Sequence, residues 1–178
     1  MNIEIQILDF IRENLSCPAM DAIMKAITFL GNAGWFWIAL GLVLSFIPKT
    51  RKIGFTICVA LIIDLVLCNL TLKPIIARTR PYDIVEGVNL IIPKPSDFSF
   101  PSGHSAASFA GAAPVFAYNK KYGFGLLALA ALIAFSRLYL YVHFPTDVLA
   151  GALVGSFCAV LAYYIIRIAY KTKSKSQK

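Results

Sequence analysis

The dodecapeptide SRLYLYVHFPTD, residues 136–147, brings an arginine, a histidine and an aspartate close together in an otherwise apolar chain. His143 is one of two histidines among the 178 residues, and Arg137 precedes it while Asp147 follows four residues later. Packing against lipid or a hydrophobic core does not favour such side chains. We therefore expect a ligand to be bound or transformed here, with the rest of the chain folded around this segment.

The composition of the chain predicts an integral membrane protein. Hydrophobic residues make up 58% of it and charged residues 15%, against about 45–50% and about 25% in soluble domains. We expect an all-α, membrane-embedded helical bundle that forms a single domain over residues 1–178. The net charge of +8 does not indicate nucleic-acid binding, because the basic residues form short runs at the ends of apolar segments. The four cysteines show no CxxC spacing, and we expect no metal and no cofactor.

Apolar segments that are long enough, or nearly long enough, to cross a bilayer follow one another along the chain. We predict about five transmembrane helices, or six if the N-terminal helices also span, at residues 34–47, 53–72, 102–117, 124–142 and 148–168. The first 32 residues contain two shorter amphipathic patterns, which predict helices lying at the membrane surface. The transmembrane bundle then covers residues 33–168, and residues 169–178 form a basic tail.

The distribution of basic residues orients these segments. Basic side chains cluster at residues 48–52, at Lys120 and Lys121, and in the C-terminal tail. The positive-inside rule assigns these places, including the C-terminus, to the cytoplasmic side of the plasma membrane. Alternation then predicts that residues 73–101 and the turn around His143 lie on the extracytoplasmic face.

The predicted outer face carries groups that bind anions. Ser102 and Gly103 follow a proline at the start of an apolar segment, where a helix N-terminus offers free backbone N–H groups. Lysine and arginine side chains donate hydrogen bonds to phosphate oxygens, and arginine does so in bidentate fashion. Lys73, Arg80 and Arg137 all fall on this face, so the anion we expect is a phosphate.

Both histidines fall on the same face as these cations. His143 and Asp147 have the spacing of a nucleophilic imidazole that is oriented by a carboxylate, and His104 supplies a second imidazole that can transfer protons. The residues thus indicate a phosphoryl-transfer site.

Three motifs in these segments resemble the signature of a known family. The chain reads KPIIARTRP at residues 73–81, PSGH at residues 101–104 and SRLYLYVHFPTD at residues 136–147. The signature of the type 2 phosphatidic acid phosphatases is a Lys, six residues, then Arg-Pro; a Pro-Ser-Gly-His; and Ser-Arg, five residues, His, three residues, Asp. The chain therefore resembles this family, which shares its fold and site with bacterial lipid phosphatases, glucose-6-phosphatase and vanadium haloperoxidases, over roughly residues 53–155.

The resemblance implies a role for each matched residue. His143 attacks phosphorus to form a phosphohistidine, Asp147 holds and polarises His143, and His104 protonates the leaving oxygen and then activates water. The phosphoryl oxygens are bound by Lys73, Arg80, Ser102, Gly103 and Arg137. The family needs no metal for this reaction.

The substrate follows less directly from the sequence. The compact chain resembles small bacterial enzymes that act on undecaprenyl diphosphate, phosphatidylglycerol phosphate or phosphatidic acid. Among these lipids, the outward-facing site favours undecaprenyl diphosphate, and the other two are alternatives. The connection at residues 82–99 is expected to cover the site, but its composition does not select the lipid. A non-catalytic lipid-phosphate carrier is an alternative of another class, although a carrier needs no nucleophile. A membrane-spanning body argues against a haloperoxidase, and the oligomeric state stays open.

Other polar and aromatic residues have simpler interpretations. Asp64 lies in the middle of an apolar segment, where an acid is costly. We favour a buried structural acid, either protonated or hydrogen-bonded to Asn69 or Thr71, over a role in substrate passage. Arg78 is not required by the signature and is typical of an interfacial anchor. An interface belt is the simplest interpretation of four aromatic residues, Trp35, Trp37, Tyr139 and Tyr141.

Overall fold

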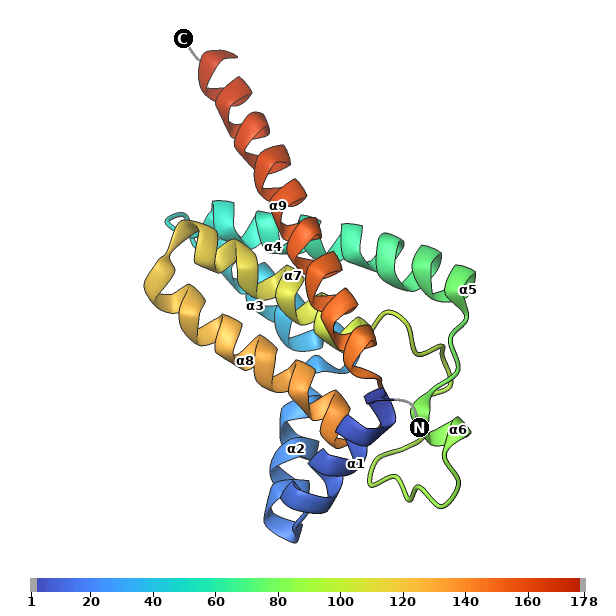
Figure 1. Cartoon of the computed structure of the whole chain (residues 1–178). Coiled ribbons are helices and arrows are strands. Elements are labelled where there is room, and N and C mark those ends of the chain that lie inside the picture. Colours follow the sequence, from blue (N-terminus) through green and yellow to red (C-terminus); the bar gives the residue numbers. More distant parts are fainter. Residues whose placement is uncertain (1–2, 177–178) are drawn as a thin grey trace.

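The computed structural model describes residues 3–176, and these residues form helices and loops without any strand (Figure 1). The prediction of an all-α fold is therefore confirmed. In chain order the elements are α1 (Ile3–Leu15), α2 (Pro18–Gly31), the 3-10 turn η1 (Asn32–Gly34), α3 (Trp35–Phe46), α4 (Arg51–Asp64), the π-helix η2 (Leu65–Leu72), α5 (Lys73–Ile76), α6 (Pro81–Ile84), α7 (Gly103–Tyr118), α8 (Lys120–Tyr139) and α9 (Pro145–Ser176).

Helix α7 lies at the centre of the bundle, where it packs against α9, α8 and α4. Its buried face consists of small residues, Ala106, Ala110, Gly111 and Ala112. Gly151 and Gly155 of α9 form a G-x-x-x-G pattern, which allows helix backbones to approach closely in membranes. A Cβ atom at Gly155 would lie 2.0 Å from the carbonyl oxygen of Ala106. This crossing holds the first turns of α7 and α9 together, and the N–H of Ser102 donates to the carbonyl of Asp147 at 3.0 Å.

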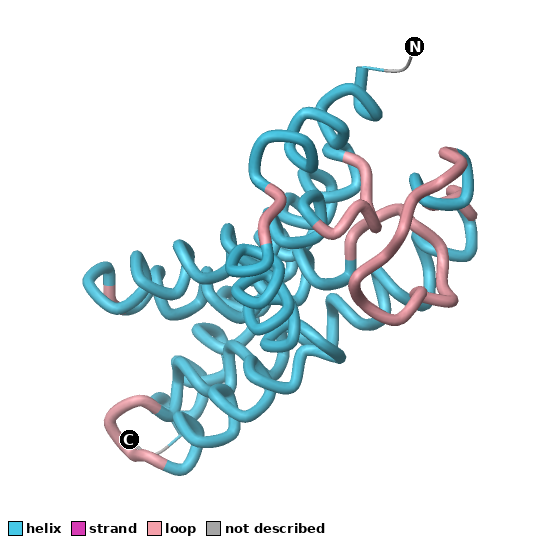
Figure 2. The backbone as a smooth tube through the Cα atoms, turned by 90° about the horizontal axis from the view of Figure 1, so that it is seen from below, coloured by secondary structure: helices cyan, strands magenta, loops and turns pink. Residues whose placement is uncertain are grey.

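The loops separate into two groups at opposite ends of the bundle (Figures 1 and 2). The short α3–α4 and α7–α8 connections lie at one end, which we call the far end. The long connection at residues 77–102 and the turn at residues 140–144 lie at the other, which we call the site end. The helices thus bring together the segments that carry the predicted functional residues.

Four helical stretches are long and apolar enough to cross a membrane: Pro18–Phe46, Arg51–Ile84, Lys120–Tyr139 and Pro145–Thr172. The predicted segment at residues 34–47 joins α2 in the first stretch, which leaves the count unchanged. The count is one below the predicted five because of a single segment. The segment at residues 102–117 becomes α7, whose 16 residues fall short of the ~20 that usually span a bilayer. Because other helices surround α7, it reaches from the site end to the far end of the bundle although it is shorter than this length.

The two N-terminal helices pack against the protein as well as exposing apolar side chains. Helices α1 and α2 contact α8 at the site end, where Leu8 and Met24 are buried. Helix α2 leads through η1 into α3, and the direction changes at Ala33 and Gly34, which have φ angles of 49° and 66°. These helices therefore help to build the site end.

The predicted basic tail at residues 169–178 is not a separate segment in its described part. Helix α9 continues through Ser176, so residues 169–176 extend the last membrane helix. Residues 177 and 178 lie outside the described residues.

Three of the four aromatic residues predicted for an interface belt are buried instead. Tyr139 and Tyr141 donate their hydroxyl hydrogens to aspartates of α2 and α1, at 2.6 and 2.7 Å. Trp37 is fully buried and donates its indole N–H to Ser108 at 3.1 Å. Trp35 alone of the four is exposed. Composition does not distinguish an aromatic ring beside lipid from one that α1, α2 or α7 covers.

Candidate active site

A cavity of about 500 Å³ lies at the site end, lined by residues of α2, α5, α7, α8 and the loops between them. Six of the eight predicted site residues line this polar cavity: Lys73, Arg80, Gly103, His104, Arg137 and His143. Asp147 lies behind His143 and is fully buried. The fold therefore brings the three sequence motifs to one place.

The His143 side chain is buried between Asp147 and Arg80. Its Nδ1 lies 3.6 Å from Oδ2 of Asp147, slightly beyond hydrogen-bond length. Its Nε2 lies 3.1 Å from a terminal nitrogen of Arg80. A guanidinium N–H can only donate, so Nε2 accepts and the ring proton is on Nδ1, facing the carboxylate. Burial, together with the charges of Arg80 and Arg137 and against that of Asp147, lowers the pKa of His143 to about 3. Nε2 is therefore unprotonated at neutral pH, and its lone pair accepts the hydrogen bond from Arg80.

Three donors fix the carboxylate of Asp147. Oδ2 accepts hydrogen bonds from the hydroxyl of Ser99 at 2.5 Å and from the N–H of Phe144 at 2.9 Å. Oδ1 accepts from Arg78 at 2.6 Å. These contacts stabilise a buried carboxylate and direct Oδ2 towards His143.

Arg78 contacts the candidate site in a way that the sequence did not reveal. Besides Asp147, its guanidinium donates to Thr146 at 2.7 Å and to Glu4 of α1 at 2.6 Å. Burial alone would raise the pKa of Glu4, but hydrogen bonds from Thr146 and Arg78 and the charge of Arg78 lower it. The prediction that Arg78 is a simple interfacial anchor is wrong, because its guanidinium contacts the carboxylate behind His143. No local signal pairs Arg78 with a residue 69 positions later.

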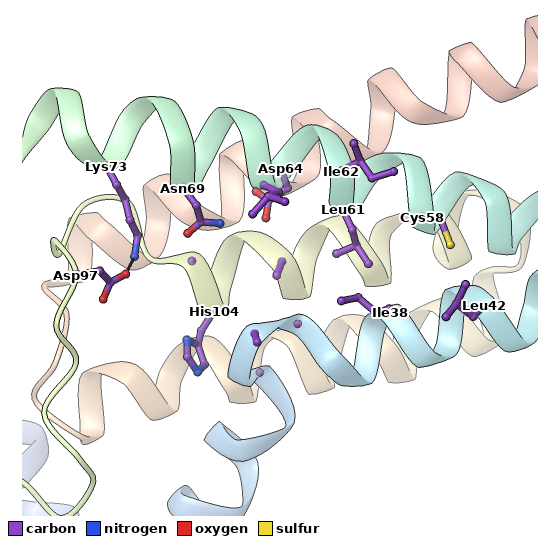
Figure 3. A pocket seen from close by; sticks show the side chains of 16 residues that line it. Ile38, Leu42, Cys58, Leu61, Ile62, Asp64, Asn69, Lys73, Asp97 and His104 are labelled. Atoms are coloured by element: carbon purple, nitrogen blue, oxygen red, sulfur yellow. Dashed lines mark hydrogen bonds and ion pairs between the residues drawn. The ribbon is translucent and has the colours of Figure 1, made fainter.

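His104 faces the cavity from the first turn of α7 (Figure 3). Its Nε2 lies 2.9 Å from the side-chain oxygen of Asn32 in η1. The preceding Gly31 allows this approach, because a Cβ atom there would lie 2.6 Å from the His104 ring. The sequence GNAG at residues 31–34 indicates a turn but does not indicate a partner for His104.

Lysine and arginine side chains supply most of the remaining polar lining. Lys73, Arg80 and Arg137 are 6%, 3% and 3% exposed, and they are cations taken out of bulk water. Arg137 donates to Thr28 of α2 at 2.5 Å, and its Nε has no hydrogen-bond partner among the described residues. Lys25 of α2, which the sequence did not single out, also lines the cavity. Such a field binds an anion with several acceptor oxygens.

Ser102 and Gly103 contribute differently from one another. Ser102 is fully buried as the N-cap of α7, and its hydroxyl accepts from the N–H and hydroxyl of Ser105 at 3.4 and 3.0 Å. It is not among the residues that line the polar cavity. Gly103 does line the cavity, and a Cβ atom there would lie 3.0 Å from the amide oxygen of Asn69 and 3.7 Å from Nζ of Lys73. A residue without a side chain keeps this space open.

The carboxylate of Asp97 lies directly on two of the cations. It forms an ion pair with Lys73, which Figure 3 shows, and another with Arg80 at 2.6 Å. Burial alone would raise the pKa of Asp97, but hydrogen bonds and charges from Lys73 and Arg80 lower it to about 2. Asp97 belongs to the connection that the sequence predicted to cover the site. Its specific pairing with Lys73 and Arg80 was not predicted.

An apolar groove of about 620 Å³ opens from the polar cavity and runs between α3 and the α4–η2 helix (Figure 3). Its apolar walls include Ile38, Leu42, Leu61, Ile62 and Leu65. The groove and the polar cavity share four lining residues, Lys73, Asp97, Gly103 and His104. An elongated apolar group can thus extend from the point where an anion would bind.

Asp64 lines the apolar groove beside the π-helix, an irregular element that is frequent at functional sites. It is 2% exposed, and its Oδ1 has no hydrogen-bond partner among residues 3–176. Thr71, one expected partner, donates instead to the carbonyl of Val66 at 2.8 Å. The expected hydrogen bond between Thr71 and Asp64 is therefore absent, and a structural role for Asp64 stays a prediction.

Comparisons with known proteins agree with this geometry. An undecaprenyl-diphosphatase of Sulfolobus acidocaldarius is 36% identical over 140 residues, which cover 77% of this chain and 68% of the relative. The crystal structure of Aquifex aeolicus LpxE superposes with a TM-score of 0.79 at 30% identity, covering 91% of this chain and 95% of that one. A transmembrane PAP2-type phosphatidylglycerolphosphate phosphatase from Bacillus subtilis gives a TM-score of 0.72 at 26% identity, covering 96% and 85%. The model of the PAP2 superfamily matches residues 51–171, and the chain therefore belongs to that superfamily.

Proposed function

We propose that this membrane-embedded phosphatase removes the terminal phosphate from a lipid diphosphate, with His143 as the nucleophile. The observation that supports this most directly is the junction between the polar cavity and the apolar groove. Both are lined by Lys73 and His104. A lipid head group can therefore meet the cations while its hydrocarbon chain lies between α3 and α4.

In the first step, Nε2 of His143 forms a bond to the terminal phosphorus as the bridging P–O bond breaks. His104 gives a proton to the departing lipid phosphate oxygen. Arg80, which contacts Nε2 at 3.1 Å, is close enough to bind an oxygen of the transferring group, and Lys73 and Arg137 face the same cavity. Cations already aimed at the developing charge stabilise such a transition state.

In the second step, His104 takes a proton from water, whose oxygen attacks phosphorus as the N–P bond breaks. The products are inorganic phosphate and the lipid monophosphate. Asp147 stabilises the positive imidazole that forms when His143 is phosphorylated. We expect this chemistry to proceed without a metal, because Lys73, Arg80 and Arg137 supply positive charge in the cavity where the phosphoryl group would bind.

Among lipids, undecaprenyl diphosphate is the substrate we favour. The support is the undecaprenyl-diphosphatase relative at 36% identity and a groove whose walls are mostly aliphatic. Phosphatidylglycerol phosphate is the second candidate, favoured by the structural likeness to the Bacillus subtilis phosphatase. Phosphatidic acid is the third.

Phosphate release by the purified, detergent-solubilised protein tests this proposal. The panel is undecaprenyl diphosphate, phosphatidylglycerol phosphate, phosphatidic acid and a soluble phosphate ester, each with wild type and His143→Ala. We expect one lipid to dominate and the variant to be silent. Binding of lipid phosphates without turnover would replace the enzyme by a carrier. Strong inhibition by chelators would contradict metal independence.

We further propose that the site end faces away from the cytoplasm, since the basic connections lie at the far end. Two matched variants test this in a Cys17→Ser background, because Cys17 is itself exposed. Ser96→Cys lies beside Asp97, whereas Lys121→Cys lies at the far end, and both positions are exposed. An impermeant thiol reagent added to whole cells should label only the Ser96→Cys variant. The reverse pattern would invert the topology.

A further inference from the structure

Asp97 contacts the same cations that the proposed function assigns to the substrate phosphate. One carboxylate oxygen pairs with Lys73 and the other accepts from Arg80 at 2.6 Å. Arg80 also holds the Asp97 backbone, because its Nε donates to the Asp97 carbonyl at 2.8 Å. A carboxylate on a guanidinium and an ammonium has the donor arrangement that phosphate oxygens also use.

The position of this carboxylate relative to His143 matters. Arg80 contacts Asp97 with one terminal nitrogen and Nε2 of His143 with the other, at 2.6 and 3.1 Å. The two terminal nitrogens belong to one planar guanidinium, so the carboxylate lies beside the approach to Nε2. Asp97 also lines both the polar cavity and the apolar groove, at the point where head group and chain would meet.

The exposure of the Lys73, Arg80 and Asp97 side chains shows which of them can move out of the ion pairs. The side chains of Lys73 and Arg80 are 7% and 3% exposed and are held by surrounding helices, whereas that of Asp97 is 52% exposed. A phosphate carries more negative charge and more acceptor oxygens than one carboxylate. The cations therefore stay in place while the carboxylate can be exchanged for a phosphate.

We propose that Asp97 is an internal competitor of phosphate, which weakens phosphate binding and speeds release of the phosphate product. This inference rests on the proposed function, because it concerns the same phosphate-binding cations. When the competent state is only a fraction of the population, the apparent affinity falls by that fraction. Replacement of Asp97 by a neutral side chain should then tighten phosphate binding.

The test is calorimetric titration of inorganic phosphate into the full-length, detergent-solubilised protein. Asp97→Asn should lower the Kd for phosphate by roughly tenfold, as expected for a carboxylate that occupies the cations about nine-tenths of the time. Asp97→Glu keeps the carboxylate and should stay within about twofold of wild type. Asp97→Ala provides a second neutral variant, and circular dichroism checks that each variant is folded.

Asp83→Asn is the matched control for the loss of one negative charge. Asp83 lies in the same connection, where it pairs with Lys94, and its carboxylate is not in contact with Lys73 or Arg80. We expect its Kd to stay near that of wild type. An unchanged or weaker phosphate affinity in Asp97→Asn would overturn the proposal, since a residue that only positions Lys73 and Arg80 would weaken binding when removed. Equal tightening by Asp83→Asn would assign the effect to net charge and also overturn it.

Kinetics add a second readout of the same proposal. In Asp97→Asn we expect a lower KM for the lipid and stronger inhibition by phosphate. Calorimetry needs no turnover, so it still decides the role of Asp97 if no lipid on the panel is hydrolysed. Failure of the proposed function and failure of this inference are thus distinguishable.

Discussion

The basic residues at the two ends of the helical bundle differ in burial and in ion pairing. At the site end, Lys73, Arg78 and Arg80 are wholly or mostly buried and paired with carboxylates. At the far end the basic residues are exposed, and no ion pair joins them to a carboxylate within residues 3–176: Lys49, Arg51, Lys52, Lys120 and Lys121. Exposed charges are screened by water and salt, whereas buried ones interact strongly. Of the basic residues behind the net charge of +8, those at the site end are therefore the ones placed to interact strongly with a bound anion.

Among substitutions at the two ends, removal of the proposed nucleophile should have the largest effect on activity. His143→Ala should reduce kcat/KM for the preferred lipid by about 10⁴-fold or more, because loss of a nucleophile leaves only binding and charge stabilisation. Lys52→Ala at the far end should stay within about twofold, since exposed substitutions change stability by only about 0.5 kcal/mol. Residual activity above one per cent in His143→Ala would assign the attack on phosphorus to another group.

Two arginines near the ends of one continuous helical stretch allow the site end and the far end to be compared with the same substitution. Arg51 begins α4 at the far end, and Arg78 follows α5 at the site end. Arg78→Gln should lower kcat by about 10–100-fold with little change in KM, since a small displacement of Asp147 misplaces His143. Arg51→Gln should remain near wild type. Equal effects of the two substitutions would show that Arg78 serves stability and not the orientation of His143.

The smallest predicted effect concerns the imidazole of His143, which should not be protonated between pH 7 and pH 5. In His104→Ala the single remaining histidine is His143, so ¹⁵N-histidine NMR reports it directly. Burial and nearby arginines lower its pKa to about 3, and its ring should stay neutral from pH 7 to pH 5. The unfolded chain takes up that proton near pH 6.5, so the free energy of unfolding should fall as the pH decreases over this range. A titration midpoint of His143 near pH 6.5 would mean that its imidazole is hydrated like an exposed one, so that the site end is as hydrated as the far end.

Local pattern was sufficient to predict the helices and the convergence of three motifs. Apolar runs separated by charged connections predict helices whose alternate ends meet, and this alone brings Lys73, His104 and His143 to one end. The length of α7 and its central position were harder to predict. A short helix of small residues is as apolar as a spanning helix, and only its neighbours show that it is enclosed.

Contacts between distant segments explain what the sequence could not reveal. Arg78 meets Glu4, His104 meets Asn32 and Arg137 meets Thr28, over separations of 74, 72 and 109 residues. Helices α1 and α2 and the turn η1 that follows them supply the three partners. Their amphipathic pattern predicted helices at the membrane surface, but it does not show that their polar faces reach the site. The pairing of Asp97 was hidden for the same reason, since it depends on the path of a long loop.

The glycine crossing of α7 and α9 has a consequence for how accurately the catalytic groups are held. His104 begins one of these helices, and Asp147 lies in the first turn of the other. At Gly155 the two backbones leave no room for a side chain between them. Where two helix backbones are in direct contact, no side chain between them can change its rotamer to absorb a shift. The distance between the helices is therefore set by atomic radii. The spacing between His104 and Asp147 is therefore fixed by the two helix backbones, and a single methyl group at Gly155 should shift the proposed proton donor relative to the proposed nucleophile, His143.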